Sequence, residues 1–190
     1  MSDQHREIVR GIFDDCVGAH RRFAEHGFDR INEAASAIGR ALSAGQKVLA
    51  FGNGGSAADA QHFVAELVGR FEIERAGLAA IALTPDSSLV TSIANDYGYA
   101  HVFSRQVDAL GRAGDVALGI STSGRSANVD AALAAARTRS LVTIALTGRD
   151  GGRMGADADI HLNVAESSTA RIQEVHRTIL HAICALIDRR

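Results

Sequence analysis

The amino-acid sequence predicts a single α/β domain with a parallel, doubly wound sheet flanked by helices, on three observations. Five short apolar runs rich in β-branched residues alternate along the chain with segments of helical period. Four of these runs are continuously apolar, which is typical of strands covered on both faces. The 190 residues contain one proline, Pro85, and no linker-like stretch, so we expect one domain over residues 1–190.

The expected elements follow in a simple order. Two helical patterns open the chain, and we expect this segment, about 5–44, to serve packing or oligomerisation. Strands are expected at about 47–51, 79–83, 115–120, 141–146 and 159–164. Helices are expected at 57–70, about 100–111, 127–139 and, as a long last helix, about 169–188. This strand–helix alternation predicts a five-stranded parallel sheet.

The composition is that of an ordinary soluble globular protein, with 46% apolar and 22% charged residues. A formal net charge of -2 gives no general attraction to nucleic acid or acidic membranes, so neither is an expected partner. The chain shows no signal peptide and no apolar run of about 18 residues, and we expect a cytoplasmic protein. Cys16 and Cys184 are expected to be free thiols.

A serine-rich loop, residues 121–126, joins a predicted strand to a predicted helix. The unpaired N–H groups and partial positive charge of a helix N-terminus favour phosphate. Ser121, Thr122, Ser123 and Ser126 add donors that carry no charge. The alternative is that Ser126 caps the helix and its neighbours merely suit a turn. The density of hydroxyl groups at this place favours phosphate.

A glycine loop, residues 52–57, also joins a strand to a helix and forms a weak repeat with the serine-rich loop. Because parallel strands all end at one edge of the sheet, the two loops predict one ligand crevice there. Read as G-x-G-x-x-A, the glycine loop also resembles a dinucleotide-binding turn. The acidic residue Asp86 lies beyond the usual spacing of about 20 residues, so nucleotide binding is a minor alternative.

His62 and Glu66 lie four residues apart on the helix that the glycine loop opens, so they share one face. At that spacing an imidazole and a carboxylate form a solvated ion pair, bind a divalent metal, or act as acid and base. Arg70 closes the same helix, where it either contacts an anionic substrate or stabilises the helix C-terminus. Spacing alone leaves these alternatives open.

The last helix carries an apolar stripe, with Gln173 at its edge and His181 on its polar face. These two residues are about 12 Å apart along the helix, so their side chains would meet at one small site only if both were fully extended toward it. His176 falls within the stripe and is expected to be a core or interface histidine. Asn95 and Asp96 end a segment after the second strand, at the edge of the sheet where the ligand crevice is predicted. Substrate binding and a plain surface role are equally open for them. Surface positions are expected for His5, His20, His26 and His101, and a structural role for His161.

Together these residues resemble the sugar isomerase (SIS) domain family, and within it the phosphoheptose isomerases, over almost the whole chain. The matching stretches are 52–63 with Glu66, 94–98, 103–106, 119–126, 146–148 with Gly151 and Gly152, and 171–176 with His181. The resemblance implies a flavodoxin-like fold and an aldose–ketose isomerisation. Sedoheptulose 7-phosphate would become D-glycero-D-manno-heptose 7-phosphate through an enediol, as the first step toward nucleotide-activated heptoses.

The same resemblance implies a role for each matching residue. Glu66 would be the base that moves a proton between C1 and C2, and His181 its acid–base partner. The phosphate would be held by Ser121, Thr122, Ser123 and Ser126. Contacts with the rest of the substrate would come from Asn53, Gly54, Gly55, Arg70, Asn95, Asp96 and Gln173.

Members of this family are described as homotetramers with active sites between subunits and with zinc in each subunit. The resemblance places that zinc on His62, Glu66, Gln173 and His181, a set of ligands that suits the metal. Glu66 cannot easily be both a bound ligand and a free base. A site shared between subunits would also remove the difficulty of the spacing along the last helix.

A second class of SIS protein is a regulator without enzymatic activity, such as a tetramer that binds the replication initiator DnaA. That regulator resembles this chain around residues 93–96. It lacks acidic and imidazole groups at the positions of Glu66 and His181. Because both groups are present here, the sequence favours an enzyme over a binding protein.

Overall fold

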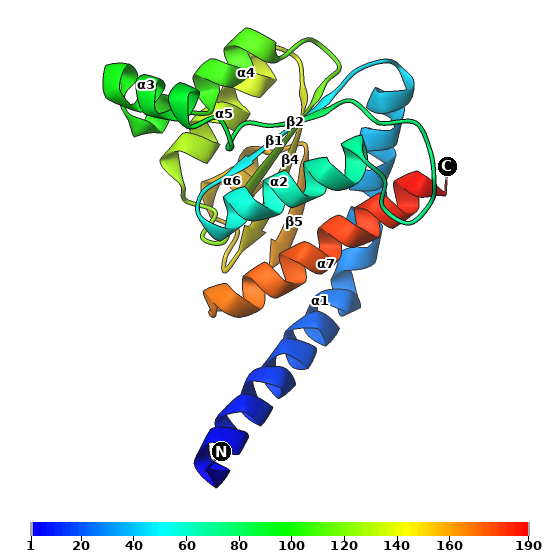
Figure 1. Ribbon diagram of the computed structural model, residues 1–190, viewed down its shortest axis with the longest axis vertical. Coiled ribbons are helices and arrows are strands. Elements are labelled where there is room, and N and C mark those ends of the chain that lie inside the picture. Colours follow the sequence, from blue (N-terminus) through cyan, green and yellow to red (C-terminus); the bar gives the residue numbers. More distant parts are fainter. Residues whose placement is uncertain (1, 190) are drawn as a thin grey trace.

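The five strands form one parallel sheet between two layers of helices in the computed structural model, which describes residues 2–189 (Figure 1). In chain order the elements are α1 (Asp3–Ser43), β1 (Val48–Gly52), α2 (Gly55–Val68), β2 (Ala80–Ala82), α3 (Ser87–Tyr97), η1 (Tyr99–His101), α4 (Ser104–Leu110), β3 (Val116–Ser121), α5 (Ala127–Thr138), β4 (Val142–Gly148), α6 (Gly152–Asp157), β5 (Ile160–Val164) and α7 (Thr169–Asp188). The strand order β2-β1-β3-β4-β5 is that of a doubly wound, flavodoxin-like sheet. The predicted fold class is confirmed.

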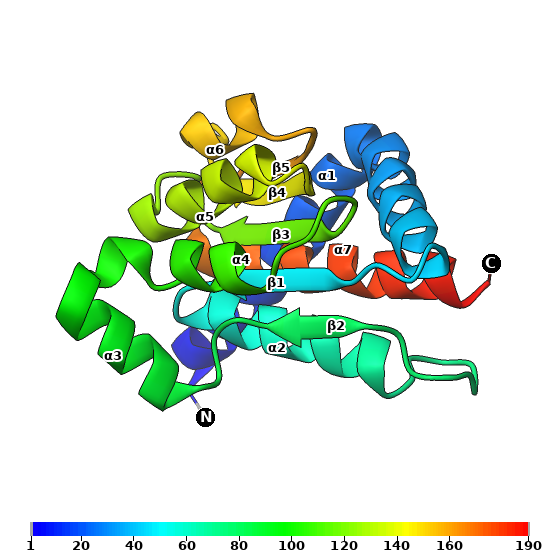
Figure 2. The ribbon, with the colours of Figure 1, turned by 90° about the horizontal axis from the view of Figure 1, so that it is seen from above.

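Different helices cover the two faces of the sheet (Figure 2). Helices α1, α2 and α7 pack on one face, where Leu118 and Leu146 lie in one cluster with Phe63. Helices α4, α5 and α6 pack on the other, where Phe51 and Leu133 belong to a second cluster. Strands β1 and β3 are buried along their whole length, which explains why their apolar runs do not alternate.

The N-terminal segment is one continuous helix, α1, and the prediction of two helices is wrong. Gly18 and Gly27 lie inside α1 without ending it, because a single glycine costs a helix only about 1 kcal/mol. Apolar residues of its first half, including Ile8 and Phe13, are exposed. The first turns of α1 extend beyond the body of the molecule (Figure 1), so Ile8 and Phe13 are not part of the core, whereas Ala19, nearer the middle of the helix, is buried in it.

Two helices, α3 and α6, were not predicted. None of the described residues of α3 is fully buried, but Val90, Ile93 and Ala94 recur at helical spacing and pack partly buried against the second cluster, so the prediction missed a signal that the sequence carries. Asp86 caps its start by accepting a hydrogen bond from the Leu89 N–H. Helix α6 has six residues and follows Gly151, whose φ of 80° favours glycine.

Both cysteines are free thiols, as expected: Cys184 is buried and Cys16 is half-buried. Among residues 2–189, none of the helices combines the length and the apolar character that crossing a bilayer requires.

Candidate active site

The glycine loop and the serine-rich loop leave neighbouring strands, β1 and β3, at the carboxyl edge where the strand order reverses. The side chains of Asn53 and Asn128 exchange two hydrogen bonds of 2.8 Å, which join the glycine loop to the first turn of α5. The Tyr99 hydroxyl donates to Asn53 Oδ1 at 3.0 Å. The two loops therefore line one edge of the sheet, in agreement with the weak sequence repeat.

The serine-rich loop is held in shape by contacts within this chain. Ser121 is only 3% exposed, and its Oγ lies 2.9 Å from Ser126 Oγ and 3.4 Å from Ser123 Oγ. Gly124 has a φ of 61°, and a Cβ at this residue would lie 2.1 Å from the Gly151 carbonyl oxygen, so only glycine fits. Ser126 occupies the N-cap position of α5, but its side chain makes no capping hydrogen bond. Its hydroxyl bonds within the loop, which removes helix capping as the explanation of the serines.

A second cluster, which we call the acid–base cluster, consists of His62, Glu66 and His181. His62 Nε2 lies 2.8 Å from His181 Nε2 and 3.3 Å from Glu66 Oε1. At the first distance, one imidazole donates its N–H to the lone pair of the other. The ring of Phe71 packs on His181 with 5.4 Å between the centroids. The helical spacing predicts the pairing of His62 with Glu66, and the contact with His181 is made across helices.

The charge state of His181 depends on its surroundings. Burial lowers the pKa of its imidazole below the ordinary value, and His62 and Arg177 act in the same direction. Glu66 and Asp59 oppose this shift by favouring the charged ring. A neutral imidazole keeps one N–H to donate and one lone pair to accept, so His181 is able to give or take a proton at a substrate oxygen.

Helices α2 and α7 lie side by side and run in the same direction, which places the site residues at different heights. At the start of α2, a Cβ on Gly55 would lie 2.3 Å from Gln173 Nε2, so the two residues are in close contact. Further along both helices, His62 meets His181. Because each residue advances a helix by about 1.5 Å, Glu66 lies about 16 Å from Gly55 and His181 about 12 Å from Gln173. Gln173 thus lies near the glycine loop rather than within the acid–base cluster.

A hollow of about 550 Å³ opens between α1, α2 and α7. Its lining combines Gly55, Gln173 and His181 with residues that the sequence analysis did not assign to a site: His20, Ala58, Asp59, Ala170, Glu174, Arg177 and Thr178. The Asp59 side chain is 2% exposed and accepts a hydrogen bond of 2.7 Å from Arg177. Asp59 precedes His62 by three residues and Arg177 precedes His181 by four, so helical spacing was the available signal.

The expectation of an exposed His20 is wrong. Its ring is half-buried, with Nε2 2.8 Å from the Thr178 hydroxyl and Nδ1 2.8 Å from the Cys16 carbonyl oxygen. These contacts join α1 to α7 beside the hollow. The partner of His20 lies 158 residues away along the chain, so local sequence carries no sign of the contact.

Three predicted substrate contacts lie apart from both clusters. Arg70 follows α2, is exposed, and lies 3.4 Å from Glu74. Asn95 and Asp96 are in the last turn of α3, where the Asn95 amide donates to Asp96 Oδ1 at 2.8 Å. Among the described residues, the hydrogen bonds and ion pairs of these three side chains do not reach the serine-rich loop or the acid–base cluster. Gly54 lies at the N-cap of α2 with a φ of 55°.

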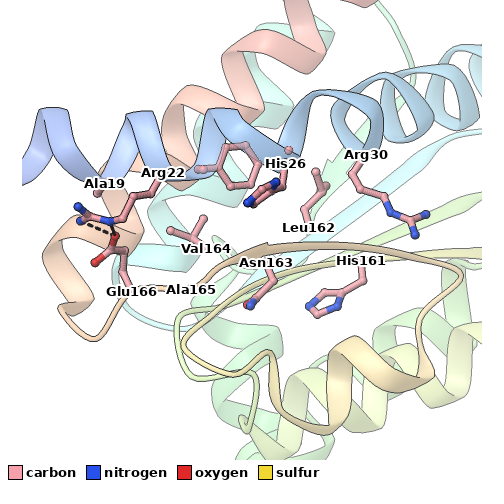
Figure 3. A pocket seen from close by; sticks show the side chains of 12 residues that line it. Ala19, Arg22, His26, Arg30, His161, Leu162, Asn163, Val164, Ala165 and Glu166 are labelled. Atoms are coloured by element: carbon pink, nitrogen blue, oxygen red, sulfur yellow. Dashed lines mark hydrogen bonds and ion pairs between the residues drawn. The ribbon is translucent and has the colours of Figure 1, made fainter.

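Another, smaller hollow lies between α1 and β5 (Figure 3). Arg22 reaches across it to Glu166 at 2.6 Å, so its charge is already balanced. His161 turns to the sheet, with Nε2 2.7 Å from the Thr147 hydroxyl, which confirms its structural role. None of the predicted site residues lines this hollow.

His176 is a core histidine, as expected. It is fully buried, and its Nε2–H donates to the Thr147 carbonyl oxygen at 2.9 Å. Burial lowers its pKa to about 4, with the Thr147 carbonyl and Asp59 opposing that shift. The neutral ring attaches α7 to β4 between Gln173 and His181.

The acid–base cluster has the ligand types that zinc prefers. Within residues 2–189, no group of three or more His, Cys, Asp or Glu side chains has the spacing of a metal site. Two nitrogens bound to one tetrahedral zinc at about 2.0–2.1 Å would lie about 3.4 Å apart, whereas His62 Nε2 and His181 Nε2 are 2.8 Å apart. The donor types therefore suit zinc, and the two imidazole nitrogens would have to lie farther apart than they do here to share one ion.

Comparisons with known proteins give one consistent result. Residues 13–148 match the SIS domain. The chain is 60% identical over 186 residues to a phosphoheptose isomerase of Neisseria meningitidis, covering 96% of this chain and 94% of the relative. It is 51% identical over 190 residues to a phosphoheptose isomerase of Halorhodospira halophila, covering 98% and 96%. A solved phosphoheptose isomerase from Neisseria gonorrhoeae superposes with a TM-score of 0.93 at 49% identity, over 97% of this chain and 99% of that one.

Proposed function

This chain belongs to the SIS domain family and, within it, to the phosphoheptose isomerases, and from that premise we propose how its residues isomerise sedoheptulose 7-phosphate. The activity is an aldose–ketose isomerisation that gives D-glycero-D-manno-heptose 7-phosphate. The observation that carries the assignment of roles is the convergence of Glu66, His62 and His181 from two helices. A base and an acid next to a carbonyl are what proton transfer between adjacent carbons requires.

The reaction needs no external oxidant, because C1 is oxidised while C2 is reduced. The Glu66 carboxylate takes a proton from C1 of the ketose, and the electron pair of that C–H bond forms the C1–C2 double bond of an enediol. His181 supplies a proton to the C2 oxygen and accepts one from the C1 hydroxyl. Glu66 then returns its proton to C2, which leaves the aldehyde at C1.

The serine-rich loop binds the far end of the substrate. Its four hydroxyl groups and the N-terminus of α5 offer uncharged donors and a partial positive charge to the phosphate dianion. Binding energy gained at that end orients the reacting carbons at the other. The loop thus serves orientation, and the acid–base cluster serves proton transfer.

We propose that each active site combines the serine-rich loop of one subunit with the acid–base cluster of another in a homotetramer. The separation of these regions along α2 supports this, since Glu66 lies about 16 Å beyond the start of that helix. The exposed apolar residues of the first half of α1 offer a surface for such assembly.

We also propose zinc as the metal of the acid–base cluster, held by His62, Glu66 and His181. Gln173 lies about 12 Å from His181 along α7, so as a fourth ligand it would come from another subunit. When bound, zinc would polarise the substrate carbonyl. A carboxylate oxygen or imidazole nitrogen that is bound to zinc cannot accept a proton at the same time, so the proton transfers assigned to Glu66 and His181 require the atoms that carry them to be free of the ion. Cytoplasmic location is likewise part of this proposal, in keeping with a phosphorylated substrate.

A coupled assay on sedoheptulose 7-phosphate, with and without chelator and added zinc, tests the proposal. We expect turnover by the wild-type protein and, after complete metal removal, a loss that zinc reverses. Turnover that survives chelation would remove zinc from the mechanism and leave the isomerase assignment intact. No turnover of any ketose phosphate, together with tight DnaA binding, would favour the regulator.

A further inference from the structure

The connection between α2 and β2, residues 69–79, folds back on the end of α2 and forms what we call the strap. The last turn of a helix leaves carbonyl groups without partners inside the helix. Here Arg75 supplies the missing donors: its guanidinium donates to the Glu66 carbonyl oxygen at 2.8 Å and to the Leu67 carbonyl oxygen at 2.8 Å. The Leu78 N–H also donates to the Leu67 carbonyl oxygen at 3.0 Å. The turn of α2 that carries Glu66 is therefore fixed by the strap.

Asp188, in the last turn of α7, holds the strap from the other side. Its fully buried carboxylate accepts hydrogen bonds from the Glu72 N–H at 3.0 Å, the Ile73 N–H at 3.1 Å and Arg75 Nε at 2.8 Å. One buried carboxylate thus connects the end of α7 to the guanidinium that caps α2. A buried charge is stable only when it is paired and hydrogen-bonded in this way.

Both helices tied by the strap carry the acid–base cluster. Asp188 follows His181 by seven residues, two turns of helix, so both lie on the same side of α7. The strap also contributes Phe71, whose ring packs on His181 with 5.4 Å between centroids. One short segment therefore contacts the backbone of Glu66, the ring of His181 and the helix end beyond it.

We propose that Arg75 and Asp188 are positioning residues for the proton-transfer step, with Phe71 as their contact on His181. The strap sets the distance between α2 and α7 and the orientation of the His181 ring, and hence the approach of Glu66 and His181 to C1 and C2. It has no contact with the serine-rich loop among the described residues. Loss of the contact between Asp188 and Arg75 is therefore expected to lower the rate of chemistry and to leave the phosphate contacts of the serine-rich loop in place. This inference rests on the roles proposed above for Glu66 and His181.

A matched pair of buried carboxylates provides the test. Asp115, directly before β3, also accepts two backbone N–H groups, from Lys47 at 2.9 Å and Arg112 at 2.8 Å, and one cation, Lys47 Nζ at 2.5 Å. Asp188→Asn and Asp115→Asn remove one charge each from equivalent networks. Both are expected to lower the melting temperature, because each weakens a buried network.

Only the change at Asp188 is expected to lower kcat for sedoheptulose 7-phosphate, by about tenfold or more, since small misplacements of reacting groups are costly. Its KM should stay within about twofold of the wild type, because uniform binding is unchanged. Phe71→Leu keeps apolar volume and removes the aromatic ring, and should lower kcat by about three- to tenfold with little loss of stability. If Asp188→Asn does not fold, Phe71→Leu decides the question.

Ring resonances of His62 and His181 in histidine-labelled protein give a readout that does not depend on turnover. They should shift in Asp188→Asn and Phe71→Leu and stay in place in Asp115→Asn. If the wild type turns over no ketose phosphate, the proposed function fails and these resonances alone decide on the strap. Unmoved resonances, or a kcat that falls no further in Asp188→Asn than in Asp115→Asn, would overturn the inference.

Discussion

The serine-rich loop and the acid–base cluster are built in different ways. The loop is complete within one chain: Ser121, Ser123 and Ser126 bond to one another, and Gly124 packs against Gly151. The cluster depends on two helices from opposite ends of the sequence, with His62 and His181 separated by 119 residues. The serine-rich loop is therefore shaped mainly by residues close in sequence, whereas bringing His62 to His181 needs the tertiary fold.

Position on the fold separates the same two regions. The loop lies at the carboxyl edge of the sheet, where α2 begins, and Glu66 lies near the end of α2. In the proposed function, substrate affinity depends mainly on the serine-rich loop and turnover on the acid–base cluster. Variants in the two regions should accordingly change different kinetic constants.

The largest expected effect is at the base. Glu66→Gln keeps size and hydrogen-bonding capacity but cannot accept a proton from carbon, so kcat should fall about 10³-fold with KM little changed. Glu33→Gln, an exposed carboxylate that pairs with Arg30, is the control and should keep wild-type kinetics. Steady-state assays on sedoheptulose 7-phosphate decide it, and unchanged turnover in Glu66→Gln would refute the assigned base.

The next effect concerns α7, which carries both Gln173 and His181. The folded-state pKa of His176, about 4, lies below its unfolded value of about 6.5, so below pH 6.5 the unfolded chain binds a proton that the folded one does not. Stability should fall by about 3 kcal/mol as the pH drops from 6.5 to 4. Urea unfolding at several pH values measures this change.

His176→Gln provides the control for that pH dependence, because its amide can still donate to the Thr147 carbonyl oxygen but does not titrate. The slope of stability against pH should be smaller in this variant between pH 6.5 and 4. An identical slope in both proteins would show that other groups dominate.

A smaller effect is expected in the serine-rich loop. Ser126→Ala removes one donor to a charged phosphate, worth about 1.5–3 kcal/mol, so KM should rise about tenfold or more with a smaller change in kcat. Ser168→Ala is the matched control, since Ser168 caps α7 by accepting from the Arg171 N–H. It should cost about 1 kcal/mol of stability and leave KM unchanged. Equal KM values in the two variants would contradict the phosphate role.

The sheet and most of its covering helices were predictable because buried positions are apolar and recur with the period of the strand or helix that carries them. The continuous apolar runs of β1 and β3 correspond to strands buried at every residue. Helix α3 gives a weaker signal, since its apolar residues Val90, Ile93 and Ala94 are only partly buried against the second cluster. The continuity of α1 was missed because the helix carries two separate apolar stripes, which the prediction assigned to two helices. The second stripe faces the sheet, and the first is exposed.

The site was predictable as far as local spacing reaches. His62 and Glu66 share a helical face, and the serines share a loop, so both groupings are visible in sequence. The contacts of His20, Arg177 and Asp188 with distant partners were not, because they depend on how helices pack. The same packing places Gln173 beside Gly55 rather than beside His181.

The central claim, that the loop of one subunit serves the acid–base cluster of another, can be tested directly with mixed oligomers. One parent is Glu66→Gln and the other is the double variant Ser121→Ala, Ser126→Ala, each carrying a different affinity tag. Co-expressed hybrids are purified over both tags and assayed below the KM of the loop variant.

In such hybrids every chain carries one defect, so a site built from a single chain is never intact. We predict that the hybrids regain sedoheptulose 7-phosphate turnover that neither parent shows, because some sites combine an intact loop with an intact Glu66. Hybrids no more active than the two parents assayed separately would place both regions of each site on the same chain and contradict the account.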